Sequence, residues 1–236
     1  ESFADNADLV LGQNSVTENV PYSGGATSCN TVRSIASDGN ALATADPMLN
    51  RVLLFNPIPT KNNTVANNQL GQPNLTSSMA NYAGFNANRL IEPFRSYSDG
   101  EHFFIVERSN NRILIWNSLS NSNDRPADVI IGQVDFNHGD CNYQPSGSST
   151  LISASSICYP SALSVINGKL FVADTGNMRV LVWNKVPTTN YAPADFVLGQ
   201  KAFNTNLSDV ADEAKITYPT AITTDGTKLF VGDEGY

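Results

Sequence analysis

The feature that most constrains the fold is an internal repeat. A short, mostly apolar run ending in Gly-Gln occurs four times along the 236 residues, with its glycines at Gly12, Gly71, Gly132 and Gly199. The intervals between these glycines are 59, 61 and 67 residues. A repeat of this kind indicates units that each bury an apolar face against the next unit, so we expect one continuous array rather than several unlike domains.

A second motif lies between these runs. An acidic residue precedes an arginine by five positions, and an apolar pattern follows the arginine. The three pairs are Asp46 and Arg51, Glu107 and Arg112, and Asp174 and Arg179. Each arginine lies 20 residues before the next Gly-Gln glycine, whereas the stretch after each Gly-Gln varies in length. The constant interval indicates a structured unit, and the variable one indicates a loop that tolerates insertion.

Each unit divides into four predicted strands, as the third unit shows most clearly. Its strand patterns cover residues 160–165, 169–174, 179–183 and 195–199. Asn-Gly separates the first two strands, and Asp-Gly occupies this place in the other units, which predicts type I′ hairpin turns. Four antiparallel strands per repeat are typical of a propeller blade, so we predict an all-β protein, a β-propeller with repeats of about 60 residues.

Residues 1–236 are therefore predicted to form a single propeller region. Blades are predicted at 32–72, 93–133 and 160–200, with a partial blade at 219–236. Residues 1–13 are predicted to be the outer strand of a preceding or closing blade. A partial blade leaves an unpaired sheet edge, so we expect this chain to be a fragment of a larger propeller. A four-bladed ring closed by the first strand is the alternative.

The third repeat carries a resemblance to a known family. Leu170–Val182 reads Leu-Phe-Val-Ala-Asp-Thr-Gly-Asn-Met-Arg-Val-Leu-Val and resembles the NHL-repeat core, in which Asp-Thr-Gly-Asn-Asn-Arg-Val lies between apolar strands. The similarity recurs in phase over three repeats and half of a fourth, and implies an NHL-repeat β-propeller of the secreted bacterial type. Glu107, Leu49 and Met178 depart from the pattern. The resemblance implies a propeller of typically six blades that serves mainly as an interaction platform, although a few relatives are enzymes.

The repeated acid–arginine pairs are interpreted as structural. An acidic residue at a strand end can accept backbone N–H bonds in the following turn, and an arginine five residues later can pair with it. A role repeated once per blade is more consistent with holding each blade together than with chemistry. Trp116 and Trp183 end the third predicted strands and are interpreted as core or blade-to-blade packing.

Strand alternation sorts the connections into two faces. The acid-to-arginine turns and the long connections after Gly-Gln share one face, called here the loop-rich face, and the Asp-Gly turns lie on the other. Binding residues concentrate on such loops, so the loop-rich face is the candidate binding face. Its candidate contact residues are Tyr22, Tyr82, Phe85 and Tyr143. The alternative is that each ring holds its own loop against the blades.

No residue set predicts catalysis, a metal or a cofactor. The two histidines, His102 and His138, fall on opposite faces and cannot share a metal site in this architecture. Asp135, Asn137 and Asp140 have the oxygen-ligand spacing of a calcium loop without its distal bidentate acid. An ordinary Asn/Asp/Gly turn is the alternative for this segment.

The net charge restricts the class of partner that this chain can bind, and the cysteines bear on its cellular compartment. The net charge is −8, with 14 basic and 22 acidic residues, which argues against nucleic-acid binding. No stretch approaches the roughly 20 apolar residues that a membrane helix needs, so no membrane insertion is expected. A bridge between Cys141 and Cys158 would favour an oxidising compartment, with three reduced thiols, Cys29 included, as the alternative.

These observations predict a non-enzymatic binding or scaffold protein that is extracellular, periplasmic or attached to a cell surface. The expected partner is a protein or a glycan, and the oligomeric state is left open. One alternative is a propeller hydrolase or lyase with a metal in the central channel, whose histidines would lie in other blades. Another is a subunit of an extracellular assembly in which open blade edges pack together.

Overall fold

A computed structural model describes residues 7–19, 25–27, 29–119, 123–207 and 215–235. Within these ranges the structure is all-β, with three four-stranded antiparallel sheets in chain order and one antiparallel pair. The first sheet contains β1 (Ser34–Ser37), β2 (Leu42–Asp46), β3 (Arg51–Phe55) and β4 (Asn68–Leu70). The second contains β5 (Pro93–Ser98), β6 (Phe103–Glu107), β7 (Arg112–Trp116) and β8 (Val129–Ile131). The third contains β9 (Pro160–Ile166), β10 (Lys169–Asp174), β11 (Arg179–Trp183) and β12 (Phe196–Leu198), and the pair is β13 (Pro219–Thr224) with β14 (Leu229–Asp233). The predicted four-stranded blade is confirmed.

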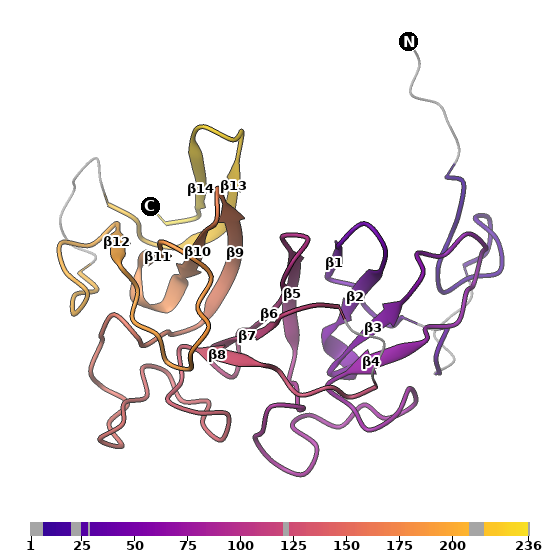
Figure 1. Ribbon diagram of the computed structural model, residues 1–236, viewed down its shortest axis with the longest axis horizontal. Coiled ribbons are helices and arrows are strands. Elements are labelled where there is room, and N and C mark those ends of the chain that lie inside the picture. The colour runs from indigo at the N-terminus through magenta and orange to yellow at the C-terminus, as the bar shows by residue number, and fades with distance from the viewer. Residues whose placement is uncertain (1–6, 20–24, 28, 120–122, 208–214, 236) are drawn as a thin grey trace.

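The blades follow one another around an axis formed by their first strands. Figure 1 shows β1–β4 on the right, β5–β8 in the middle and β9–β12 on the left, with the yellow pair β13–β14 above the third sheet. β1 contacts β5, β5 contacts β9, and β9 contacts β13. The hydroxyls of Ser34 and Ser96 lie 2.8 Å apart, and Tyr97 Oη donates to the Val165 carbonyl at 3.2 Å. First strands inside and fourth strands outside are the arrangement of a β-propeller.

The core lies between the blades. Phe104 and Val106 of β6 pack in one cluster with the third blade, whereas Phe103 and Ile105 pack in another with the first. Successive side chains of a strand point to opposite faces, so the middle blade buries both faces of β6, β7 and β8, and these strands are almost entirely apolar. This burial explains why these strands lack the alternation of apolar and polar residues typical of a half-exposed sheet.

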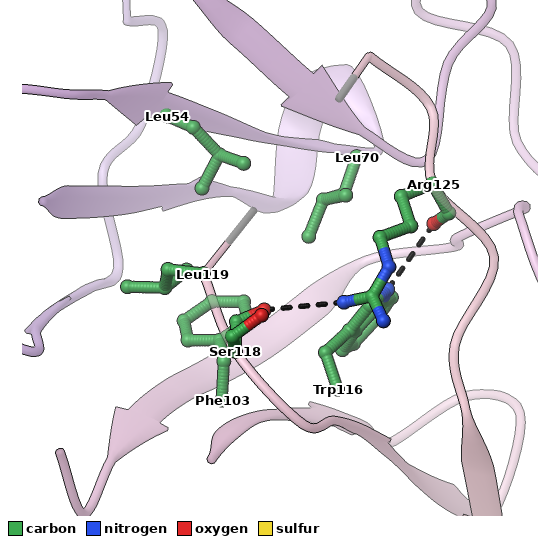
Figure 2. Close-up of a pocket in the computed structure, with 7 residues that line it drawn as sticks. All are labelled: Leu54, Leu70, Phe103, Trp116, Ser118, Leu119 and Arg125. Carbon is green, nitrogen blue, oxygen red and sulfur yellow. Dashed lines mark hydrogen bonds between the residues drawn. The ribbon is translucent and has the colours of Figure 1, made fainter. Parts of the chain in front are cut away.

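Trp116 closes the contact between the first two blades. Figure 2 shows Trp116 and Phe103 of the second blade facing Leu54 and Leu70 of the first. The indole N–H donates to the Arg125 carbonyl at 3.1 Å, and the space among these side chains is only about 10 Å³. A space of that size holds one water at most, so the predicted packing role fits and no ligand site is formed there.

The short turns differ from the expected type in three of four cases. Asn167 and Gly168 both have positive φ, as a type I′ turn requires, but at the other positions only the glycine does. The aspartates there accept backbone N–H bonds from residues two and three positions later; Asp99, for example, accepts from Glu101 and His102 at 2.9 and 2.6 Å. This capping holds a four-residue loop, which needs no second residue of positive φ.

The described part of the predicted outer strand over residues 1–13 is not a strand. It nevertheless lies where an outer strand would lie, because the Val10 carbonyl accepts the Asn63 N–H at 3.0 Å. Ile130 in β8 makes the same contact with Tyr191, at 2.9 Å. Residues 7–13 therefore make the hydrogen bond to the next blade that an outer strand makes. They are not a strand, because no described strand lies beside them to form a hydrogen-bonded ladder. No helix in the described residues is long and apolar enough to cross a membrane.

Candidate functional site

The loop-rich face is built on the buried acid–arginine pairs. In each of the three complete blades the acidic residue ends the second strand and lies opposite the arginine that begins the third. Arg112 Nε lies 2.5 Å from Glu107 Oε2, and Arg179 Nε lies 2.7 Å from Asp174 Oδ2, with all four side chains fully buried. These pairs lie in the hairpins that carry the loops.

The first blade uses the same positions with different contacts. Asp46 and Arg51 face each other across the hairpin and are both buried. Asp46 accepts backbone N–H bonds from Asn30 and Leu49 at 2.7 and 3.3 Å. Arg51 donates to the Gly25 carbonyl at 3.0 Å. This carboxylate caps the η1 turn (Pro47–Leu49), whereas the guanidinium reaches the preceding loop.

Each arginine also binds the two long loops that flank its blade. Arg112 donates to the carbonyl of Phe136 in the following loop at 3.0 Å and to that of Arg89 in the preceding loop at 2.9 Å. Arg179 repeats this with the carbonyls of Phe203 and Ser156. Long loops held by buried charged donors lose less conformational entropy when they bind a partner, because they are already ordered.

The glutamine of each Gly-Gln run adds to this order and was missed by the sequence reasoning. Gln133 is fully buried, and its Nε2 donates to the carbonyls of Asn111 and Asp140 at 2.9 and 2.8 Å. Gln72 makes the equivalent bonds in the first blade. The signal was present in the sequence, since this glutamine recurs in all four copies of the run.

Burial sets the electrostatics of the pairs. Desolvation raises the pKa of Glu107, and the neighbouring Arg112 guanidinium opposes this rise. Asp174 is alike: burial raises the pKa of its carboxyl, against the opposing charge of Arg179. Two opposite charges that satisfy each other inside a blade serve the fold, and neither is available to a ligand.

The structure exposes two of the predicted contact residues in one loop, and one of them packs on the loop that holds a third. Tyr82 and Phe85 are each 39% exposed and lie in the loop after the first blade. Phe85 packs so closely on Gly139 of the next loop that a Cβ there would lie 2.5 Å from its ring. Tyr143 is half-buried in that next loop and stacks on His138, with ring centroids 4.1 Å apart. Tyr82, Phe85, His138 and Tyr143 are called here the aromatic surface.

The alternative expectation for these rings also has support. Phe85 lies 5.9 Å from the Arg112 guanidinium carbon and Tyr82 lies 5.4 Å from that of Arg89, so both rings pack on their own framework. Anchoring and exposure therefore coexist in the same side chains. The remaining candidate, Tyr22, lies outside the described residues.

The histidines occupy separate turns. His102 Nδ1 lies 3.0 Å from Asp99 Oδ2 in the β5–β6 turn, and His138 Nδ1 lies 2.7 Å from Asp135 Oδ1 in a loop of the loop-rich face. Within the described ranges, no three His, Cys, Asp or Glu side chains gather as a metal site would require.

The calcium candidate has turn-forming contacts. Asp135 Oδ1 also accepts the Asn137 N–H at 2.8 Å, and the Asp140 carbonyl accepts from the Gln133 amide. These bonds match the alternative of an Asx turn, in which the carboxylate caps its own loop. Nothing here tests whether Asp135, Asn137 and Asp140 bind calcium.

A disulfide ties the longest loop to the third blade. Cys141 and Cys158 are bonded across a sequence separation of 17 residues. The Cys158 N–H donates to the buried Asp174 carboxylate at 2.7 Å, so the bridge ends at the acid–arginine pair. Cys29 is a half-buried free thiol, and burial raises its pKa.

Comparison with known proteins identifies a fold and no family. No family model matches the chain. No curated protein matches it either. An auxiliary nutrient binding protein from Bacteroides ovatus is similar in structure, with a TM-score of 0.54, 11% identity, and coverage of 88% of this chain and 47% of that one. The corresponding protein from Bacteroides thetaiotaomicron has a TM-score of 0.50, 13% identity, and coverage of 89% and 46%. A protein from Lactobacillus plantarum has a TM-score of 0.50, 13% identity, and coverage of 88% and 50%.

These likenesses support the β-propeller fold. The chain spans about half the length of the three similar structures. At sequence identities this low, a structural likeness supports an inference about the fold but none about the function. Membership of the NHL-repeat family and the number of blades stay predictions.

Proposed function

We propose that this protein is a non-enzymatic binding protein whose aromatic surface on the loop-rich face contacts a protein or a glycan. The observation that carries the proposal is the combination of exposure and order in that surface. Tyr82 and Phe85 are each 39% exposed, yet both pack on arginine side chains of the framework. Rings that are ordered before binding lose little entropy when a partner covers them.

The residue types suit such a contact. Tyrosine, phenylalanine and arginine are enriched in protein interfaces, where they carry much of the binding free energy. The flat, half-exposed rings of Tyr82 and Phe85 equally suit the apolar face of a sugar. Two of the similar structures are named auxiliary nutrient binding proteins, which agrees with a binding role.

The proposed location is extracellular, periplasmic or on a cell surface, in an NHL-type propeller. The Cys141–Cys158 disulfide supports it, because disulfides persist in oxidising compartments. The enzymatic alternative would need a metal-ligand set near the axis. Among the described residues, the groove along the inner strands is lined by Arg95 to Tyr97, Ala162 to Ser164 and Ala221 to Thr223, and none of these carries a carboxylate or an imidazole.

The test is site-specific photo-crosslinking together with a glycan array. A photo-reactive phenylalanine analogue replaces Tyr82 in one variant and Phe196 in the matched control, since Phe196 is an exposed ring on the outer strand β12. If the partner is a protein, we expect the probe at position 82, but not the probe at position 196, to crosslink to one major species. If the partner is a glycan, we expect the wild-type chain to bind the array, the variant Tyr82→Ala/Phe85→Ser to lose this binding, and the control Phe196→Ser to keep it. Equal crosslinking from both positions, with array binding unchanged in the double variant, would refute the proposal.

A further inference from the structure

Three arginines surround one phenylalanine at the loop-rich end of the inner strands. The guanidinium carbons of Arg33, Arg108 and Arg95 lie 3.9, 5.1 and 6.0 Å from the centre of the Phe94 ring. They come from three elements: Arg33 immediately precedes β1, Arg95 lies in β5, and Arg108 follows β6. Three like charges have gathered on one ring in a chain whose net charge is −8.

These arginines differ from four others of the chain in lacking a described acidic partner. Arg89, Arg112, Arg125 and Arg179 each pair with a carboxylate. Among the described residues, no carboxylate oxygen lies within 4 Å of the Arg33, Arg95 or Arg108 side-chain nitrogens. Unneutralised charges this close repel each other, and an anion placed among them relieves that repulsion.

Two nearby carboxylates accept hydrogen bonds from other groups. Glu92, two residues before Phe94, accepts the Ser109 hydroxyl at 2.7 Å. Asp233 accepts the backbone N–H groups of Thr217 and Tyr218 at 2.9 and 2.5 Å. Neither carboxylate lies within 4 Å of a side-chain nitrogen of these arginines, so neither forms an ion pair with them.

Most guanidinium donors of the cluster are available. Arg95 donates through Nε to the Ser161 carbonyl at 3.0 Å, and Arg108 donates through Nη2 to the Tyr218 hydroxyl at 2.9 Å. Each contact uses one of the five N–H groups of a guanidinium and orients the rest. The Arg33 side chain is exposed, and its guanidinium donates no hydrogen bond to a described residue. Such planar forks match the oxygens of a carboxylate or a phosphate.

A hollow adjoins the cluster. The groove between the inner strands β5, β9 and β13 has a volume of about 230 Å³, and Arg95 both lines it and contacts Phe94. A register shift between Pro93 and Arg95 puts Phe94 outside the ladder, and bulges of this kind redirect a side chain near binding sites. The groove is slightly smaller than the sites of drug-sized ligands, which suits a small anion.

We propose that this groove mouth, formed by Arg33, Phe94, Arg95 and Arg108, binds an oxyanion group, a carboxylate or a phosphate, of a small ligand. The ligand's charged group lies among the guanidiniums, and its uncharged part lies along the groove. This site goes beyond the proposed binding face, because it lies at the axis and shares no residue with the aromatic surface.

The test measures anion binding by calorimetry at low ionic strength, where exposed charges are least screened. The probes are inorganic phosphate, D-galacturonate and, as the neutral counterpart of the latter, D-galactose. We expect one of the two anions to bind with a Kd of about 1 mM or tighter, and galactose not to bind. Tighter binding of phosphate points to a phosphate ester, and tighter binding of galacturonate to a sugar acid.

The decisive variant is Arg33→Gln/Arg108→Gln, with Lys61→Gln/Lys228→Gln as its matched control. Both remove two exposed or half-exposed positive charges, but only the first removes donors at the groove mouth. We expect the arginine variant to raise the Kd by about tenfold or more and the lysine variant to leave it within about twofold.

Each remaining outcome overturns the proposal. The proposal fails if the wild-type chain binds neither anion at a concentration of about 10 mM. It also fails if the arginine and lysine variants lose the same affinity, because that result would show unspecific charge attraction. Thermal unfolding of each variant checks that the fold is kept. Tyr82→Ala/Phe85→Ser should leave anion binding intact, so failure of this site and failure of the proposed binding face are distinguishable.

Discussion

Replacing Arg112 by leucine should lower the free energy of unfolding by about 3–5 kcal/mol, which is the cost typical of removing one partner from a buried ion pair. The structure explains the size of this loss. Glu107 is fully buried and, while it is ionised, would be a buried charge without its partner; the carbonyls of Phe136 and Arg89 would also lose their donor. Against a typical total stability of about 5–15 kcal/mol this is a large loss. Urea unfolding followed by tryptophan fluorescence measures it.

The pH dependence of this loss is the sharper test. Burial already raises the pKa of Glu107, and without the opposing charge of Arg112 the rise becomes larger. A group whose pKa is raised on folding contributes stability below its unfolded pKa and loses that contribution as the pH rises through the folded value. The loss in free energy of unfolding that Arg112→Leu causes should therefore be smaller at about pH 4.5 than at about pH 8.

A double variant provides the control. Glu107→Gln/Arg112→Leu removes the titrating carboxyl, so its stability relative to wild type should depend less on pH and exceed that of Arg112→Leu at the higher pH. A loss below about 1 kcal/mol for Arg112→Leu, or a loss that grows as the pH falls, would refute the reasoning about a buried, desolvated pair.

Three further predictions concern the same framework. Reduction of the Cys141–Cys158 disulfide should lower the free energy of unfolding by about 3 kcal/mol, measured by urea unfolding with and without reductant, and no change would contradict the loop-closure argument. Gly132→Ala should cost about 1–3 kcal/mol more than Gly39→Ala in thermal unfolding, because both have φ +92° but only at Gly132 would a Cβ meet a backbone oxygen, at 2.9 Å. Gln133→Ala should cost about 1–3 kcal/mol and speed amide hydrogen exchange in the following loop; unchanged exchange would mean that its bonds do not order that loop.

The candidate sites were only partly accessible to prediction. Tyr82, Phe85 and Tyr143 were identified because aromatic residues on variable loops stand out in the sequence. The close contact of Phe85 with Gly139, in the loop after the next blade, was not predicted. It joins residues 54 positions apart, and the variable length of the loops gives no register from which to derive it.

The sequence by itself determined the blade pattern of this protein. Strand position, turn position and the opposition of Glu107 and Arg112 follow from local rules, since hairpin register depends on residues only a few positions apart. The tertiary structure alone decided that Arg33, Arg95 and Arg108 meet at Phe94 and that no carboxylate of the described residues forms an ion pair with them. That meeting spans 75 residues and two blades, from Arg33 to Arg108, and depends on how neighbouring blades pack around the axis, which no repeat spacing encodes.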